Sequence, residues 1–127
     1  MSEFESRVKN FVAQYLESRI AEIALVRLAN AEMEKNSPVF QKLVMTIFVE
    51  TLKVMSDFFA ASQAKGLMRR DLDPREVAAM LHGQLNFHLR TDHIRKLLLG
   101  FSLTDDDARQ NIARHVTTVF LGGIATN

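Results

Sequence analysis

A segment in the middle of the chain carries three agreeing signals for a boundary between two helices. Gly66 follows a long apolar run with helical periodicity, and glycine can take the left-handed conformation that ends a helix. Asp73 can accept hydrogen bonds from the free amides of a first helical turn, and Pro74 fits the first helical position. Glu76 completes the spacing of a capping box. The segment therefore predicts a helix that ends near Gly66 and another that begins at Pro74.

Apolar residues with helical spacing also fill the chain before this boundary. One run extends over residues 4–33 without an interrupting Gly or Pro. It predicts either one long helix or two helices with a break near residues 17–19. Ser37 and Pro38 repeat the arrangement of Asp73 and Pro74, so they predict the start of a helix that continues to residue 65.

Two further helices are predicted after the boundary. Residues 74–99 form a run with two apolar faces, ended by Gly100, and a helix with two such faces needs two partners. Thr104 is predicted to cap the last helix, because the three aspartates at 105–107 complement the positive end of a helix dipole. No segment alternates like a strand. The fold class predicted is all-α, an antiparallel bundle of about five to six helices.

Length and charge limit the classes of function. A chain of 127 residues is enough for one domain, and 16 Lys and Arg against 15 Asp and Glu give no nucleic-acid-binding surface. The absence of cysteine excludes disulfides and thiolate chemistry. The sequence contains no apolar run long enough for a transmembrane helix and no secretion signal, so a cytoplasmic protein without a membrane partner is expected.

The histidines and acidic residues do not form a pattern typical of a metal site or an enzyme. His88 and His93 diverge by about 140° around a helix. His82 and His93 share a stripe but lie about 16 Å apart along it, too far for one ion. Neither a glycine-rich phosphate loop nor a nucleophile with a neighbouring base is present. We therefore expect no metal, no cofactor and no catalytic residues.

The central segment and the end of the chain resemble the C-terminal effector-binding and dimerisation domain of TetR-family transcriptional regulators. No counterpart of that family's helix-turn-helix DNA-binding head is found here, so the resemblance covers most of residues 20–125 and only the regulatory half of such a protein. The whole chain, residues 1–127, is expected to form this single domain. In that family the first region usually contains two helices, which favours a break in the run over residues 4–33. The residues that carry the resemblance are Gly66, Leu67, Arg69 or Arg70, Asp71, Leu72, Asp73, Pro74, Ala78, Ala79, Leu81, Gly83 and the final residues 120–124.

This resemblance implies a small-molecule effector of apolar or amphipathic character, held between the helices. The Phe- and Met-rich stripe over residues 40–59 is typical of a core, but it also suits the adaptable lining of a ligand cavity. Asn86 is a further candidate for a polar contact. The predicted ligand-binding residues are Tyr15, Phe48, Leu52, Met55, Phe59, Leu85 and His88.

A homodimer is predicted through the last two helices. An apolar stripe runs along the final helix, and the helix before it has a second apolar face that a partner copy would cover as a four-helix bundle. DNA would be contacted only through the head that is missing from this chain. The alternative hypothesis is a stand-alone helical dimerisation module without a ligand. The predicted interface residues are Leu89, Ile112, Val116, Val119, Phe120 and Gly123.

Overall fold

The computed structural model describes residues 2–20, 23–35 and 38–126, and these contain six helices and no strand. The predicted all-α fold is therefore confirmed, with the number of helices that was expected. In chain order the helices are α1 (Glu3–Ile20), α2 (Ile23–Glu34), α3 (Pro38–Ala64), α4 (Pro74–Arg90), α5 (Asp92–Leu99) and α6 (Asp106–Ile124).

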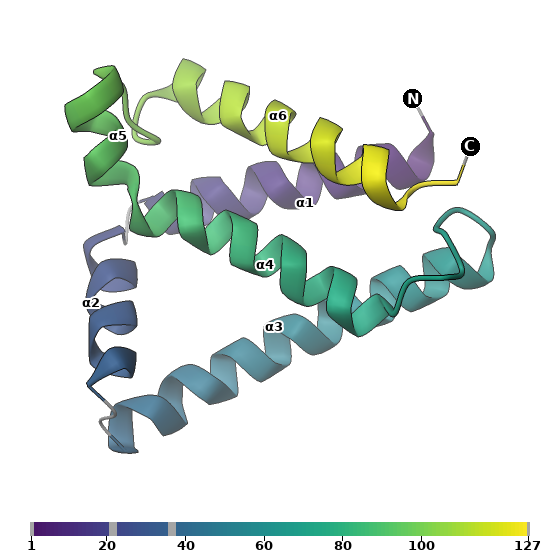
Figure 1. Cartoon of the computed structure of the whole chain (residues 1–127), viewed down its shortest axis with the longest axis horizontal. Coiled ribbons are helices and arrows are strands. Elements are labelled where there is room, and N and C mark those ends of the chain that lie inside the picture. The colour runs from purple at the N-terminus through teal and green to yellow at the C-terminus, as the bar shows by residue number, and fades with distance from the viewer. Residues whose placement is uncertain (1, 21–22, 36–37, 127) are drawn as a thin grey trace.

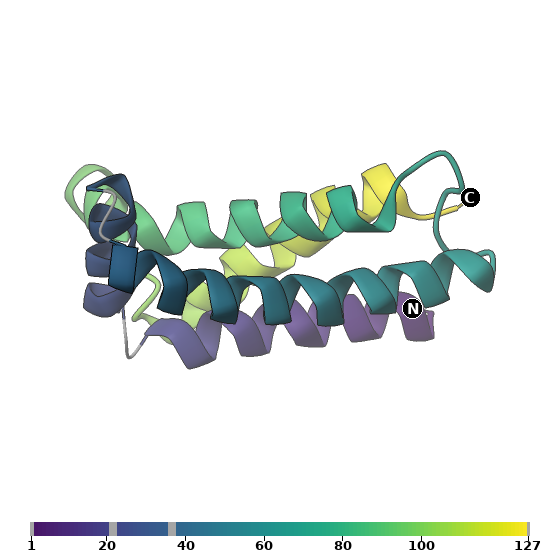
Figure 2. The same cartoon turned by 90° about the horizontal axis from the view of Figure 1, so that it is seen from below.

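The hydrophobic core lies where α1, α4, α6 and the C-terminal half of α3 meet. The closest pairings are α3 with α4 and α1 with α6, and Figures 1 and 2 show these four helices running along the length of the molecule. Each helix contributes residues at helical spacing, as expected for an amphipathic face. The main core residues are Phe4, Val8, Val12 and Leu16 of α1, Met55 and Phe59 of α3, Val77, Leu81, Leu85 and Leu89 of α4, and Ala113, Val116, Phe120 and Ile124 of α6.

The N-terminal half of α3 leaves this core. Leu43, Ile47 and Val49 are exposed there, whereas Met55 and Phe59 further along the helix are buried. Figure 1 shows α3 diverging from α1 toward this end, with α2 running across the end of the bundle between them. The divergence separates α1 from the first turns of α3 and leaves room for a hollow against α4.

The boundary segment between α3 and α4 is built as predicted. Gly66 has a left-handed backbone with φ 77°, and the Asp73 side chain accepts a hydrogen bond from the Arg75 amide at 2.9 Å. The link is also fixed to the end of the chain, because the Arg69 amide donates to the Ile124 carbonyl at 2.9 Å. The sequence did not indicate this attachment, which joins residues far apart in the chain.

The first three helices begin and end close to the predicted positions. Two helices occupy the first region, as favoured, but α1 continues through residues 17–19 to Ile20 rather than breaking there. Residues 21 and 22 lie outside the described residues. Pro38 begins α3 as predicted, whereas Ser37, predicted to cap it, also lies outside them.

The single helix predicted over residues 74–99 is wrong, because the chain forms α4 and α5 with a break at Thr91. Thr91 has φ −102° and ψ 11°, outside the helical region. The physical reason is Asp92, whose buried carboxylate accepts hydrogen bonds from Ser102 Oγ at 2.5 Å and from the Leu103 amide at 2.8 Å. If α4 continued straight through Thr91, the Asp92 carboxylate would lie away from Ser102 and Leu103, which donate hydrogen bonds to it.

The start of the last helix is shifted relative to the prediction. The N-cap is Asp105 rather than Thr104, and the helix begins at Asp106. Thr104 Oγ1 instead donates to Ser102 Oγ at 3.0 Å, and the Ser102 amide donates to Asp105 Oδ2 at 3.0 Å. Hydrogen bonds from these side chains thus hold the turn between α5 and α6. The acidic first turn of α6 is as predicted.

Candidate ligand-binding site

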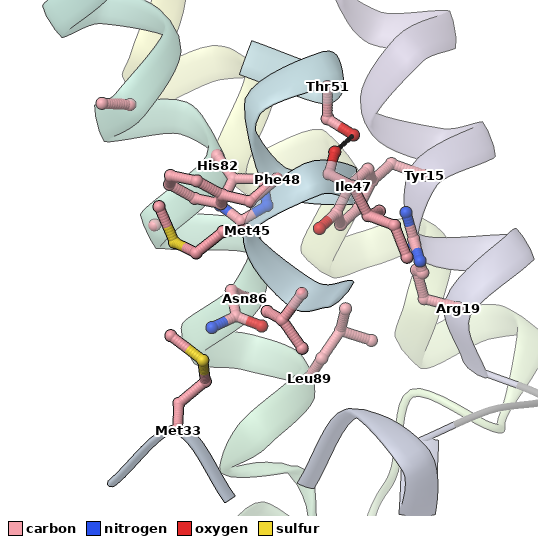
Figure 3. A pocket seen from close by; sticks show the side chains of 13 residues that line it. Tyr15, Arg19, Met33, Met45, Ile47, Phe48, Thr51, His82, Asn86 and Leu89 are labelled. Atoms are coloured by element: carbon pink, nitrogen blue, oxygen red, sulfur yellow. Dashed lines mark hydrogen bonds between the residues drawn. The ribbon is translucent and has the colours of Figure 1, made fainter. Parts of the chain in front are cut away.

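A hollow of about 460 Å³ lies between the C-terminal half of α1, the N-terminal half of α3 and the middle of α4. Its size falls in the range typical of small-molecule sites, roughly 300–1,000 Å³. Figure 3 shows side chains from these three helices and from α2 around it. The hollow is lined by Tyr15, Arg19, Met33, Val44, Met45, Ile47, Phe48, Thr51, Ala79, His82, Gly83, Asn86 and Leu89.

An aromatic cluster around His82 forms part of the wall of this hollow. The imidazole ring of His82 meets the ring of Phe48 edge-on with centroids 4.8 Å apart, and the ring of Tyr15 edge-on at 6.0 Å. Edge-to-face geometry places the positive ring edge against a negative ring face, which stabilises such pairs. The cluster therefore joins α1, α3 and α4 at one point and fixes the three side chains against one another.

Polar groups converge on the same cluster. The guanidinium of Arg19 lies over the Tyr15 ring, 5.2 Å from its centroid, and both side chains come from α1. Figure 3 shows the Tyr15 hydroxyl directed toward His82, with the Asn86 amide further along α4. On the α3 side, Thr51 Oγ1 donates to the Ile47 carbonyl at 3.0 Å, so that hydroxyl is satisfied within its own helix.

Burial sets the protonation states of the titratable groups at this site. Burial raises the pKa of the Tyr15 hydroxyl, and the nearby Arg19 charge opposes this only in part. Burial also lowers the pKa of His82, and Arg19 lowers it further. At neutral pH the site thus holds a protonated phenol, a neutral imidazole and one guanidinium cation.

The structure brings together only part of the predicted ligand-binding set. Tyr15 and Phe48 line the hollow, as expected. Leu52 is half-buried and packs against the core, and Leu85 is fully buried in it. Met55 and Phe59 are core residues that border a different hollow, of about 360 Å³, between α1 and α3. The predicted residues on α3 and α4 thus divide between the hollow at His82, the second hollow and the core.

His88 does not reach the hollow either. Its Nδ1 lies 2.6 Å from Arg95 Nη2, so His88 packs toward α5. Burial lowers the pKa of His88, and the neighbouring Arg95 adds to this effect. The histidine of α4 that lines the hollow is His82, and His88, six residues further along, is turned away from Tyr15 and Phe48.

Arg19 and His82 line the hollow but are not among the predicted ligand-binding residues. Each has a signal in the sequence, since Arg19 follows Tyr15 by four residues and His82 precedes Asn86 by four. Side chains four apart share one face of a helix. Two such polar pairs on neighbouring amphipathic helices could have identified the site.

The residues predicted for a dimer interface fall into two groups. Leu89, Val116 and Phe120 are buried within the protomer, and Phe120 packs against Phe59 with ring centroids 6.0 Å apart. These three residues belong to the chain's own core, which corrects their assignment to an interface. Of the remaining three, Ile112 is half-buried, whereas Val119 and Gly123 are exposed on α6.

Two other kinds of site are not found among the described residues. Among the residues that the structure describes, no helix is both long enough and apolar enough to cross a membrane. Within residues 2–20, 23–35 and 38–126, no three His, Asp or Glu side chains gather closely enough to hold a metal ion. The hollow around His82 combines mainly apolar walls with several polar side chains.

Comparison with known proteins places this architecture in a family. A family model described as the tetracyclin repressor-like C-terminal domain matches residues 5–119, which include the whole hollow and most of the core. Searches of curated proteins and of solved structures gave no significant match. Because the family model covers nearly the entire chain, the protein belongs to the tetracyclin repressor-like C-terminal domain family.

Proposed function

We propose that this domain is the regulatory part of a TetR-like transcriptional regulator and that it binds a small apolar or amphipathic effector in the hollow around His82. The observation that carries the proposal is the hollow itself. Its walls are mainly apolar, and its polar groups converge on one cluster. Most small-molecule sites have this composition, in which apolar walls supply affinity and a few polar groups fix orientation.

The position of the hollow suggests how occupancy would be transmitted. Tyr15 and Arg19 connect it to α1, the helix nearest to any head that precedes this domain in a longer protein. A ligand that binds one position of α1 better than another shifts the population toward that position. Two heads in a dimer must reach successive major grooves about 34 Å apart, so a small change in their spacing weakens DNA binding. Effector and operator would then oppose each other reciprocally.

A thermal-shift screen with a library of apolar and amphipathic compounds tests the binding site. An effector at a concentration 100-fold above its Kd stabilises the folded state by about 2.7 kcal/mol. For a chain of this size, that corresponds to a rise in Tm of roughly 8–14 °C. The blocking variant is Ala79→Phe, because Ala79 lines the hollow on α4.

Ala13→Phe is the matched control, since Ala13 is also an exposed helical alanine but lies on α1 outside the hollow. Hits are expected to stabilise wild type and Ala13→Phe but not Ala79→Phe. A library without hits, or hits that stabilise Ala79→Phe equally well, would show that this hollow is not an effector site.

We further propose that the domain forms a homodimer through α4 and α6. Figure 2 shows α4 and the C-terminal part of α6 on the side of the molecule opposite α1. Three large apolar side chains on these helices are exposed: Met80 and Phe87 on α4, and Val119 on α6. Soluble monomers rarely leave extended apolar surface in water, and a second copy packed on α4 and α6 would cover these side chains.

The interface can be tested with one charge substitution and a matched control. Val119 is 69% exposed on α6, and Val54 is 68% exposed on α3, a helix outside the proposed interface. Light scattering at tens of micromolar should find wild type and Val54→Asp dimeric, and Val119→Asp shifted to monomer. A monomeric wild type, or a Val119→Asp variant that remains dimeric, would refute this assignment.

A further inference from the structure

The hollow around His82 contains a single fixed charge, and that charge has no counter-ion in the described part of the chain. Arg19 is the only charged side chain among the described residues that line the hollow. It takes part in none of the ion pairs that the described residues form. Its guanidinium is half-buried and lies over the Tyr15 ring. A partly desolvated cation that no described carboxylate neutralises favours a ligand that supplies a negative charge.

The neighbouring polar groups suit an acceptor on the ligand rather than a second cation. The Tyr15 hydroxyl keeps its proton at neutral pH, because burial raises its pKa. The neutral His82 ring carries one N–H donor, because burial and Arg19 disfavour its second proton. The site therefore offers donors with a total charge of one, which matches a monoanion and leaves a dianionic phosphate only half neutralised.

The rest of the lining is suited to an apolar body. Val44, Ile47 and Phe48 of α3 face the hollow, and Leu89 of α4 and Met33 of α2 extend the apolar wall away from Arg19. Methionine and aromatic side chains adapt to irregular apolar shapes. The hollow thus combines one charged side chain with an extended apolar wall, which continues from Ile47 beside Arg19 to Met33.

We propose that the ligand is a carboxylate with an apolar aliphatic or aromatic body. This inference rests on the effector-binding function proposed above. The carboxylate pairs with the Arg19 guanidinium and accepts a hydrogen bond from the Tyr15 hydroxyl. The apolar body lies along Ile47 and Phe48 toward Leu89. Such pairing joins two charged partners in planar geometry, the arrangement in which arginine binds carboxylates most strongly.

Isothermal titration calorimetry with matched carboxylates and amides tests this ligand class. The probes are octanoate with octanamide, and phenylbutyrate with phenylbutanamide, because each pair differs almost only in charge. Wild type should bind the preferred carboxylate roughly 10- to 100-fold more tightly than its amide, the range for a charge-assisted hydrogen bond.

Two arginine substitutions separate the local charge from the overall charge of the protein. Arg19→Gln should abolish the preference for the carboxylate, and Arg19→Lys should restore part of it. Arg90→Gln makes the same change in net charge on the exposed surface of α4, outside the hollow, and should keep the full preference.

Several outcomes would overturn the proposal, and they are distinct from a failure of the effector site itself. An amide that binds wild type as tightly as its carboxylate would show that the ligand class is wrong, although the hollow would still be a binding site. A carboxylate preference that survives in Arg19→Gln, or failure of both carboxylates to bind at millimolar concentration, would also refute it. The proposed function is decided separately, by the library screen with Ala79→Phe.

Discussion

The buried ion pair between Asp92 and Arg95 should be the most sensitive point of this fold to a single substitution. The side chains of Asp92 and Arg95 are 7% and 11% exposed, and Arg95 Nη1 lies 2.8 Å from Asp92 Oδ1. The same carboxylate accepts hydrogen bonds from Ser102 and from the Leu103 amide. Asp92→Ala would leave the buried guanidinium of Arg95 without its counter-ion and would free two donors, the Ser102 hydroxyl and the Leu103 amide, in the link before α6.

The expected cost follows from that burial. Removing one partner of a buried ion pair typically costs about 3–5 kcal/mol, a large part of a total stability of roughly 5–15 kcal/mol. Asp92→Asn should cost less, about 1–3 kcal/mol, because the amide oxygen still accepts one of the hydrogen bonds. The double variant with Arg95→Met should recover part of the loss, since it removes the uncompensated charge.

A second pair in the chain provides the control. Asp106 and Arg109 have the same three-residue spacing, with Arg109 Nη2 2.6 Å from Asp106 Oδ1, but the Asp106 side chain is 80% exposed. Asp106→Ala should therefore cost no more than roughly 1 kcal/mol. Urea unfolding followed by circular dichroism measures each variant. If Asp92→Ala and Asp106→Ala lower the unfolding free energy equally, burial is not what makes the first pair important.

Two further predictions concern the same unfolding measurement. Gly83→Ala should raise the unfolding free energy by about 0.5–1 kcal/mol, because Gly83 lies inside α4 and an added Cβ meets no atom within 4 Å. Gly66→Ala should instead lower it by about 1–2 kcal/mol, since φ 77° disfavours a side chain; the same sign for both would contradict this. The folded state lowers the pKa of both His82 and His88, so the unfolded chain binds more protons below their usual pKa of about 6.5. Stability should be fully present above about pH 7 and should fall as the pH drops through about 6.5 toward the lowered values. The double variant His82→Gln with His88→Asn should flatten this dependence between about pH 7.5 and about pH 5.5, and an unchanged slope would exclude these two histidines as its source.

The helix boundaries that were predicted correctly depend on local chemistry. Gly66, Asp73 and Pro74 act within a few residues of their own positions, so the signals could be recognised without knowing the rest of the fold. The break at Thr91 depends instead on Asp92 meeting Ser102, ten residues further along. In a helical pattern Asp92 resembles any exposed acidic residue, and only the tertiary contact shows that it is buried.

The same limit explains which dimer residues were misassigned. An apolar stripe such as that of Val116 and Phe120 shows that one side of a helix must be covered, but not which surface covers it. In this fold α1 packs against α6 and the core of the same protomer covers both residues. Val119 lies next to that stripe and is left exposed, which is why it replaces Phe120 as the residue to test.

The candidate site shows where pattern analysis could have gone further. Tyr15 and Arg19 are four residues apart on α1, and His82 and Asn86 are four apart on α4, so each pair presents two polar groups on one face. Each pair interrupts an otherwise apolar stripe of its helix, at about the same depth in the bundle. If such a pair is buried, its polar groups need hydrogen-bond partners from the protein or from a ligand. What the sequence cannot supply is the divergence of α3, which decides that these two pairs face a hollow rather than a packed interior. The position of the candidate site is thus set by the divergence of α3 from α1, and its polar chemistry by four residues on α1 and α4.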